Sequence, residues 1–266
     1  MRIRAGGIDI GYDVAGPDGT PWVTFANSIA SDRGMWRAQV AALAGRYRVL
    51  TFDARGHGDT TATPPPYSFD TLAGDVVALW DALGIGRSHL VGLSLGGMVA
   101  VGLALAHGER LASLVVANSM MEATPQFVKS WDERIALARA KGLDAVVEPT
   151  LARWLTPAFV AADPDVAEAV RAMIRRTSRE GFIGAAEALK TLDFRRRLAE
   201  IRVPTLFVAG TEDIACPASG VRAEAALVPG AEYAGIDGAA HISNIERPDA
   251  FSRAVADFIA RHDAPA

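Results

Sequence analysis

Cysteine is nearly missing from this sequence, because Cys216 is the only one among 266 residues. A chain with one thiol forms no internal disulfide, so nothing in it points to an oxidising compartment. Common metal and cofactor motifs are also missing, including H-E-x-x-H, C-x-x-C, G-x-x-x-x-G-K-[ST] and a complete G-x-G-x-x-G. We therefore expect an activity that uses no metal and no cofactor.

An excess of positive charge is lacking as well. The chain has 27 Lys and Arg against 31 Asp and Glu, a formal net charge of −4 at pH 7. Nucleic-acid binding needs clustered cations that release counterions. The arginines within 171–179 and 195–197 are not interleaved with aromatic residues, and we interpret them as solvated helix faces. Nucleic acid is not an expected partner, and the sequence predicts no particular oligomeric state.

Long hydrophobic segments are rare. Residues 1–10 alternate charged and apolar side chains without a cleavage signal, so we expect no signal peptide and a cytoplasmic protein. Residues 90–106 carry no charge and could be taken for a membrane span, but Gly96 and Gly97 interrupt them. A buried strand, a sharp turn and a buried helix have the same hydropathy. No membrane contact is expected.

Short apolar runs alternate with segments of helical periodicity along most of the chain. After an antiparallel pair over 2–14, strand patterns are predicted at 22–25, 47–52, 89–93, 114–117, 205–209 and 232–236. Helical patterns at 36–44, 72–83 and 96–106 separate the early strands. This succession predicts an α/β fold with a mostly parallel sheet flanked by helices.

The alternation stops after residue 118, and residues 125–192 contain helical stretches without a convincing strand. This segment looks like an insertion, because the strand pattern resumes after it. We expect one core domain in two parts, 1–120 and 195–266, with a helical cap over 121–194 inserted after the sixth strand.

A G-x-S-x-G sequence, Gly92-Leu93-Ser94-Leu95-Gly96, lies between a predicted strand and a predicted helix. This is the context in which the motif presents a nucleophile. The tight turn strains the backbone at the serine, and the flanking glycines remove Cβ atoms that would collide. We predict Ser94 as a nucleophile at the carboxyl end of the sheet. The alternative is a glycine-rich turn with an incidental serine.

A serine nucleophile needs an imidazole base and a carboxylate that orients it. Among the five histidines, His241 follows the last strand pattern and is predicted as the base, whereas His57 is interpreted as a turn residue. Asp213, after the strand at 205–209, is the predicted acid. Asp237 is its rival, since it lies close to His241 in the sequence. Along the chain the nucleophile Ser94 comes first, the acid Asp213 second and the base His241 third. Serine hydrolases whose nucleophile lies in a turn between a strand and a helix have this same order.

A tetrahedral intermediate also needs hydrogen-bond donors aimed at its oxyanion. The backbone N–H of Leu95, just after the nucleophile, is one predicted donor. The second is expected from the loop after the strand at 22–25, where we assign Ile29 N–H, with Ser28 as the alternative.

Six segments together resemble the 3-oxoadipate enol-lactonases of the α/β-hydrolase superfamily. They are Asn27-Ser28 with Gly34-Met35-Trp36, Asp53-Ala54-Arg55-Gly56-His57-Gly58, Gly92-Leu93-Ser94-Leu95-Gly96-Gly97-Met98, Ala152-Arg153-Trp154-Leu155-Thr156-Pro157, Ala209-Gly210-Thr211-Glu212-Asp213 and His241-Ile242-Ser243-Asn244-Ile245-Glu246. The resemblance runs along nearly the whole chain and implies the eight-stranded α/β-hydrolase fold. Departures are Leu95 in place of methionine, Arg33, and the stretch 29–31, which lines the expected oxyanion loop.

The resemblance implies that Ser94 opens an enol-lactone through an acyl-enzyme and that water then releases 3-oxoadipate. Such a lactone carries a free carboxylate, so its pocket needs a cation. Arg153 and Arg134 in the expected cap are the candidates, with Trp131 and Trp154 as apolar walls. For the tryptophans, simple packing within the cap is the alternative.

Other activities fit the same motifs. A carboxylesterase, an acyl-homoserine lactonase or a cofactor-free perhydrolase would use the same three residues. A hypothesis from another functional class is a small-molecule receptor that kept the hydrolase pocket and binds its ligand with little or no turnover. The expected partner in every enzymatic reading is a small ester or lactone.

Overall fold

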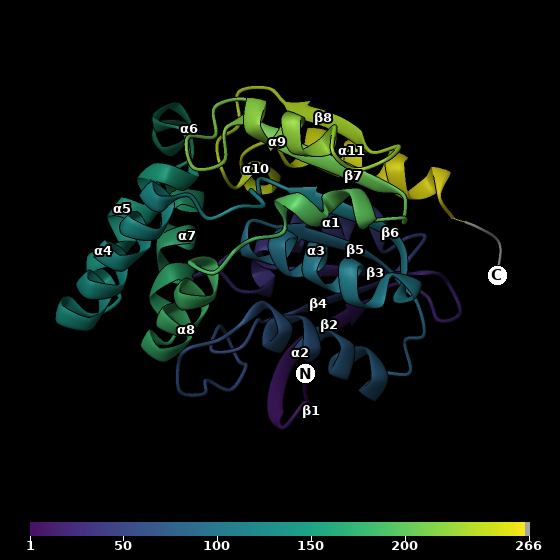
Figure 1. Ribbon diagram of the computed structural model, residues 1–266, viewed down its shortest axis with the longest axis horizontal. Coiled ribbons are helices and arrows are strands. Elements are labelled where there is room, and N and C mark those ends of the chain that lie inside the picture. Colours follow the sequence, from purple (N-terminus) through teal and green to yellow (C-terminus); the bar gives the residue numbers. More distant parts are fainter. Residues whose placement is uncertain (264–266) are drawn as a thin grey trace.

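The computed structural model describes residues 1–263 (Figure 1). One sheet has the strand order β1-β2-β4-β3-β5-β6-β7-β8. Its strands are β1 (Arg2–Ala5), β2 (Ile8–Ala15), β3 (Trp22–Ala26), β4 (Arg48–Phe52), β5 (Ser88–Leu93), β6 (Leu111–Ala117), β7 (Thr205–Gly210) and β8 (Glu232–Ile236). Strand β2 pairs antiparallel with β1 and β4, and the pairs from β4 through to β8 are parallel. The predicted mostly parallel, eight-stranded sheet is confirmed.

Helices flank the sheet because its central strands are apolar on both faces. Every residue of β5 and of β7 is buried, as is typical of parallel strands covered on both sides. Helix α1 packs against α11, and α2 packs against α3. The flanking helices are α1 (Arg37–Leu43), α2 (Phe69–Ala82), α3 (Leu95–His107), α9 (Ala218–Ala225), α10 (Ser243–Glu246) and α11 (Pro248–Arg261), with short 3-10 turns η1 (Arg33–Trp36), η2 (Gly108–Arg110) and η3 (Arg195–Glu200).

The uncharged stretch at 90–106 divides between two elements. Strand β5 ends at Leu93 and helix α3 begins at Leu95, so the polar turn at Ser94 separates them. Within the described part of the chain, no helix has both the length and the apolar character that crossing a bilayer requires.

A helical insertion, α4–α8, lies between β6 and β7 (Figure 1). It consists of α4 (Pro125–Lys141), α5 (Asp144–Trp154), α6 (Pro157–Ala162), α7 (Pro164–Arg176) and α8 (Arg179–Leu189). Proline begins α4, α6 and α7, where its missing N–H costs no helical hydrogen bond. The side chain just before each of these prolines, from Thr124, Thr156 or Asp163, caps the helix.

The two chain segments that connect the helical insertion to the sheet are bonded to each other. Ala123 N–H donates to Leu192 O at 2.8 Å, and Phe194 N–H donates to Met121 O at 2.8 Å. Glu224, on α9, accepts the N–H of Met121 at 2.9 Å. The insertion is therefore fastened to the core where it leaves β6.

Candidate active site

Ser94 occupies the turn between β5 and α3 in a constrained conformation. Its φ is 56° and its ψ is −117°, and a positive φ is uncommon for any residue other than glycine. A Cβ built on Gly96 would lie 2.1 Å from Ala26 O, and one built on Gly92 would lie 2.2 Å from Gly96 O. Only glycine fits at either position, so Gly92 is needed for the turn itself and Gly96 for the close approach of β3 to the start of α3.

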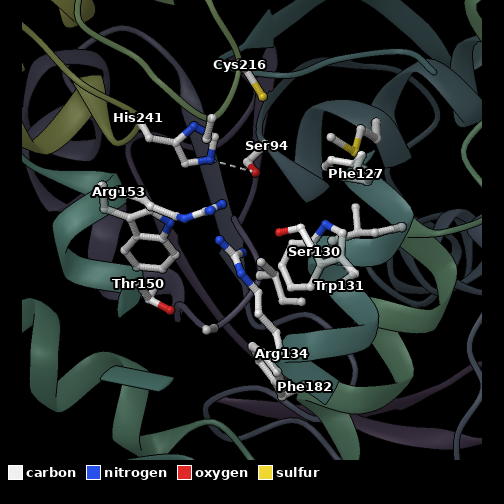
Figure 2. Close-up of a pocket in the computed structure, with 16 residues that line it drawn as sticks. Ser94, Phe127, Ser130, Trp131, Arg134, Thr150, Arg153, Phe182, Cys216 and His241 are labelled. Atoms are coloured by element: carbon white, nitrogen blue, oxygen red, sulfur yellow. Dashed lines mark hydrogen bonds between the residues drawn. The ribbon is translucent and has the colours of Figure 1, made fainter. Parts of the chain in front are cut away.

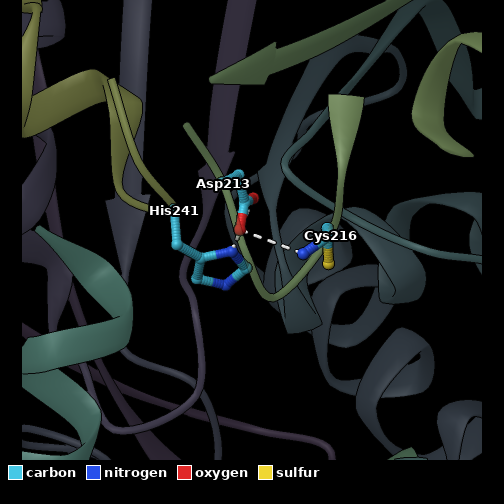
Figure 3. A group of neighbouring side chains, drawn as sticks. All are labelled: Asp213, Cys216 and His241. Atoms are coloured by element: carbon cyan, nitrogen blue, oxygen red, sulfur yellow. Dashed lines mark hydrogen bonds and ion pairs between the residues drawn. The ribbon is translucent and has the colours of Figure 1, made fainter. Parts of the chain in front are cut away.

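His241 and Asp213 meet Ser94 at the carboxyl end of the sheet, although the chain separates them widely. His241 Nε2 lies 2.9 Å from Ser94 Oγ, and His241 Nδ1 lies 2.9 Å from Asp213 Oδ2. Figure 2 shows the bond between the serine and the histidine, and Figure 3 shows the Asp213 carboxylate next to the imidazole ring. All three side chains are buried. The structure therefore brings together the three predicted residues in a chain of two hydrogen bonds, from Ser94 to His241 and from His241 to Asp213.

Asp213 is held by four donors. Its Oδ1 accepts from the backbone N–H groups of Ala215 at 2.8 Å and Cys216 at 3.0 Å, and its Oδ2 accepts from Asn118 Nδ2 at 2.9 Å besides His241. Burial by itself would raise the pKa of this carboxyl. The adjacent His241 and these hydrogen bonds outweigh burial and hold the pKa below its usual range.

Neither rival residue approaches Ser94. Asp237 is exposed in the turn after β8. His57 is fully buried in the turn after β4, where its Nδ1 lies 2.9 Å from Arg55 O. Burial lowers the pKa of His57 to about 4, which leaves the ring neutral at pH 7. The structure therefore favours Asp213 over Asp237 and places His57 as a turn residue.

Asn118 is a site residue that the sequence reading missed. It lies just after β6 with φ 47°, and its side chain bridges two parts of the site. Its Nδ2 donates to Asp213 Oδ2, and its Oδ1 accepts from Ser243 Oγ at 2.6 Å. A polar residue at the carboxyl end of a central parallel strand was the available signal.

The predicted oxyanion donors come from two loops. Leu95 N–H opens helix α3, and neither it nor Ile29 N–H has an acceptor within residues 1–263. Ile29 lines the pocket above Ser94, whereas the buried Ser28 does not. The structure thus favours Ile29 over Ser28. Ala30, with φ 57°, makes the bend that follows.

The loop that carries Ile29 is anchored from behind. Arg33 N–H donates to Asp53 Oδ1 at 2.7 Å, and the Arg33 guanidinium bonds the other oxygen of the same buried carboxylate. Asn27 Nδ2 donates to Phe52 O at 2.9 Å, and Trp36 Nε1 donates to Asn27 Oδ1 at 2.8 Å. These bonds fix the loop to the end of β4.

A pocket extends from Ser94 and His241 to the underside of the helical insertion (Figure 2). All four predicted substrate-binding residues line it, namely Arg153, Trp154, Trp131 and Arg134. Both tryptophans are buried, so they also contribute to packing within the insertion. Cys216 lines the same pocket from the core side.

The two arginines differ in their surroundings. Arg134 lies over the Trp131 ring, 4.6 Å from its centroid, and its Nη2 is buried without a hydrogen-bond partner. Burial, with the charge of Arg153, lowers the pKa of Arg134 to about 10. Arg153 is exposed at the end of α5. Among residues 1–263, no acid forms an ion pair with either arginine.

Asp213, Cys216 and His241 also form a group whose side-chain atoms lie within metal-binding distance of one another (Figure 3). The geometry does not suit a metal, because Asp213 and His241 are bonded to each other, Asp213 also accepts two backbone N–H groups, and the second imidazole nitrogen is bonded to Ser94 Oγ. Burial raises the pKa of the Cys216 thiol well above its ordinary value, so the thiolate that a metal needs is disfavoured.

A comparison with known protein families identifies the class of protein that has this fold and this site. A family model described as alpha/beta hydrolase fold matches residues 21–248. The chain belongs to this family, and it is a hydrolase of carboxylic esters or lactones.

Two similar proteins are enol-lactonases. The chain is 33% identical over 253 residues to 3-oxoadipate enol-lactonase 1 of Acinetobacter baylyi, covering 95% of this chain and 94% of the relative. The crystal structure of the enol-lactonase from Burkholderia xenovorans LB400 superposes with a TM-score of 0.94 at 36% identity, covering 98% of this chain and 100% of that one. The resemblance drawn from the motifs is confirmed.

Other relatives carry other names. A Klebsiella pneumoniae (strain 342) protein named RutD, described provisionally as a carbamate hydrolase, is 31% identical over 91% of this chain and 92% of its own length. Relatedness therefore supports hydrolysis more firmly than it supports one substrate.

Proposed function

We propose that the protein is a serine hydrolase that opens a carboxylate-bearing enol-lactone through an acyl-enzyme. The observation that carries this proposal is the continuous chain of hydrogen bonds from Ser94 Oγ through His241 to Asp213. A serine in hydrogen-bond contact with a buried imidazole, itself oriented by a carboxylate, is an activated nucleophile.

In the first half of the reaction, Ser94 Oγ attacks the lactone carbonyl while His241 Nε2 accepts the hydroxyl proton. The N–H groups of Leu95 and Ile29 stabilise the oxyanion, each contributing about 3 kcal/mol to lowering the barrier. The intermediate collapses by breaking the ring C–O bond, and His241 returns the proton to the leaving enol oxygen. The enol then tautomerises to a ketone, which favours ring opening.

In the second half, water replaces the enol. His241 Nε2 removes a proton from water, the hydroxide adds to the acyl carbonyl, and the ester bond to Ser94 breaks as His241 protonates Oγ. The product carries a second carboxylate. Asp213 stays ionised throughout and stabilises the imidazolium.

The substrate class is supported by the cations of the pocket. Arg134 is half-buried, has one buried N–H without a partner, and points its guanidinium into the pocket next to that of Arg153, as Figure 2 shows. A buried N–H of a guanidinium without a partner costs stability, and a substrate carboxylate would offset that cost. The names of the enol-lactonase relatives support the same substrate, 3-oxoadipate enol-lactone. We assign residues 121–194 as a cap that supplies this binding surface to a core of 1–120 and 195–266.

A substrate comparison tests this function. The measurement is kcat/KM for 3-oxoadipate enol-lactone, p-nitrophenyl acetate and an uncharged lactone, with wild type and Ser94→Ala. The enol-lactone should be the best substrate of the wild type. The variant should fold normally, hydrolyse none of them, and escape labelling by a fluorophosphonate.

The outcomes separate the alternatives. Labelling at another residue would overturn the acyl-enzyme. Turnover of the acetate without turnover of the enol-lactone would indicate a different esterase. Binding with no turnover of any of the three would indicate a receptor.

A further inference from the structure

Glu246 is a buried carboxylate that the proposed reaction does not use. It ends α10, is 2% exposed, and forms no ion pair with any cation in residues 1–263. An ionised group without a counter-ion is costly to bury unless hydrogen bonds replace its hydration. The groups that bond to it therefore show what it holds in place.

One oxygen of Glu246 bonds the helical insertion. Its Oε1 accepts the N–H of Thr156 at 3.1 Å and also the Thr156 hydroxyl. Thr156 is the residue that caps α6, two positions after Trp154 and three after Arg153. This oxygen therefore fixes the turn at the end of α5, the helix that carries the pocket residues Thr150, Arg153 and Trp154.

The other oxygen bonds the loop of the catalytic histidine. Glu246 Oε2 accepts the N–H of Ala240, the residue before His241, at 2.7 Å. On the other side of the histidine, Ile242 N–H donates to Trp154 O at 3.1 Å. The N–H groups of both residues that flank His241 are thus tied to the same turn of the insertion, that of Ala240 through Glu246 and that of Ile242 directly.

We propose that Glu246 is a positioning residue that couples the arginine-bearing turn of the insertion to the general base His241. Displacement of Thr156 moves the carboxylate that orients Ala240, and with it the imidazole that must stay 2.9 Å from Ser94 Oγ. Contact of a substrate with Arg153 or Trp154 is thereby transmitted to the base. This inference rests on the proposed function only through the roles of Ser94 and His241.

Glutamine cannot replace this carboxylate. A neutral amide has one acceptor oxygen, and its NH2 group would face either the N–H of Ala240 or the donors of Thr156. One donor would remain buried and unpaired. Glu246→Gln keeps the size of the side chain, so it tests the hydrogen bonds rather than the packing.

The experiment measures the rate at which a neutral fluorophosphonate phosphonylates Ser94, with Oγ displacing fluoride from phosphorus, because that rate depends on His241 and needs no contact with the arginines. Glu246→Gln should slow phosphonylation by about 10- to 100-fold and also lower kcat for p-nitrophenyl acetate. KM for a carboxylate-bearing ester should rise, while KM for the acetate should change little. If Glu246 were merely structural, the substitution would lower the melting temperature and would change KM for the two substrates alike.

Glu224 provides a matched control. It is also a buried carboxylate, 6% exposed, that accepts a backbone N–H of the segment entering the insertion, but it bonds Met121 instead of the His241 loop. Glu224→Gln should be phosphonylated at a rate within about twofold of wild type, since no bond to the triad changes. If Glu246→Gln is phosphonylated as fast as Glu224→Gln, the coupling role is refuted.

Thr156 variants keep the proposal testable if Glu246→Gln does not fold. Thr156→Val removes the hydroxyl bond to Glu246 and should slow phosphonylation of Ser94 by about 3- to 10-fold, whereas Thr156→Ser should restore the wild-type rate. Equal rates for the two variants would overturn the proposal. A wild type that is not labelled at Ser94 would refute the proposed function itself, and the two failures are therefore distinguishable.

Discussion

At Ser94, backbone and side chain are constrained by different parts of the chain. The turn with φ 56° at Ser94 lies within five consecutive residues, and Gly92 is needed inside it, whereas Gly96 is needed because Ala26 O of strand β3 approaches closely. The hydrogen bond from Oγ to His241 spans 147 positions in the sequence. The nucleophile motif could therefore be recognised directly, whereas its partners could be assigned only by the order of strands and loops.

At the same scale, Asp213→Asn should reduce kcat by roughly 10⁴-fold, the loss seen in the best-studied triad. The amide presents a donor or a weaker acceptor to His241 Nδ1, so the ring loses its correct tautomer and the stabilisation of its charged form. Steady-state kinetics on p-nitrophenyl acetate measure this loss. Asp237→Asn is the control and should behave as wild type, because Asp237 is exposed. A larger loss for Asp237→Asn would reverse the assignment.

At the scale of elements, α4 and α5 contribute cations to the pocket from adjacent helices. Arg134 comes from α4 and is partly buried against Trp131, while Arg153 ends α5 and is exposed. An ion pair in a desolvated site is screened less by water and salt than one at the surface. The resemblance in the sequence favours Arg153 as the residue that binds the carboxylate, with Arg134 as the second candidate, and their different burial reverses that order.

Arg134→Leu should lower kcat/KM for a carboxylate-bearing lactone by about 10- to 100-fold, the value of a charge-assisted hydrogen bond of about 1.5 to 3 kcal/mol. Arg153→Ala should have a smaller effect, because its guanidinium is solvated. Neutral esters should be nearly unaffected by either change. The comparison uses both substrates together with a thermal melt.

Arg139→Leu is the matched control on α4, since Arg139 is exposed and lies 3.5 Å from Glu187, outside the pocket. Equal losses on charged and neutral substrates in Arg134→Leu would indicate a structural role for Arg134 instead of carboxylate binding.

At the scale of the whole molecule, buried ionisable groups make stability depend on pH. Burial lowers the pKa of His57 to about 4, while an ordinary histidine in the unfolded chain has a pKa of about 6.5. Between these values the unfolded state binds the extra proton, so stability falls as the pH falls from about 6.5 to about 4. Glu224, whose pKa burial raises to about 7, acts in the opposite direction.

Several groups contribute to the pH dependence of stability, so the contribution of His57 is isolated by comparing wild type with a variant that lacks this side chain. Between pH 7 and pH 4.5, wild type should lose about 2 to 3 kcal/mol more unfolding free energy than His57→Asn. Urea denaturation at the two pH values measures the difference. His107→Asn is the control and should lose as much as wild type, because the His107 side chain is 47% exposed. An equal loss in wild type and His57→Asn would contradict the assignment of this dependence to His57.

Sequence alone determined the architecture and the elements of the candidate site. Period-two and helical patterns are local, and so are the glycines around Ser94, which is why the parallel sheet, the helical insertion and the nucleophile turn could be read without coordinates. Chain order then placed Asp213 and His241 at the same end of the sheet.

Only the tertiary structure decided which buried polar groups satisfy one another. Asn118 bonds Asp213 across 95 positions, and Glu246 bonds Thr156 across 90. No sequence pattern links residues at these separations, because such partners meet only when loops that follow different strands pack together. The same packing half-buries Arg134 and leaves its Nη2 without a partner while Arg153 stays exposed, since burial depends on neighbouring helices rather than on the residue itself.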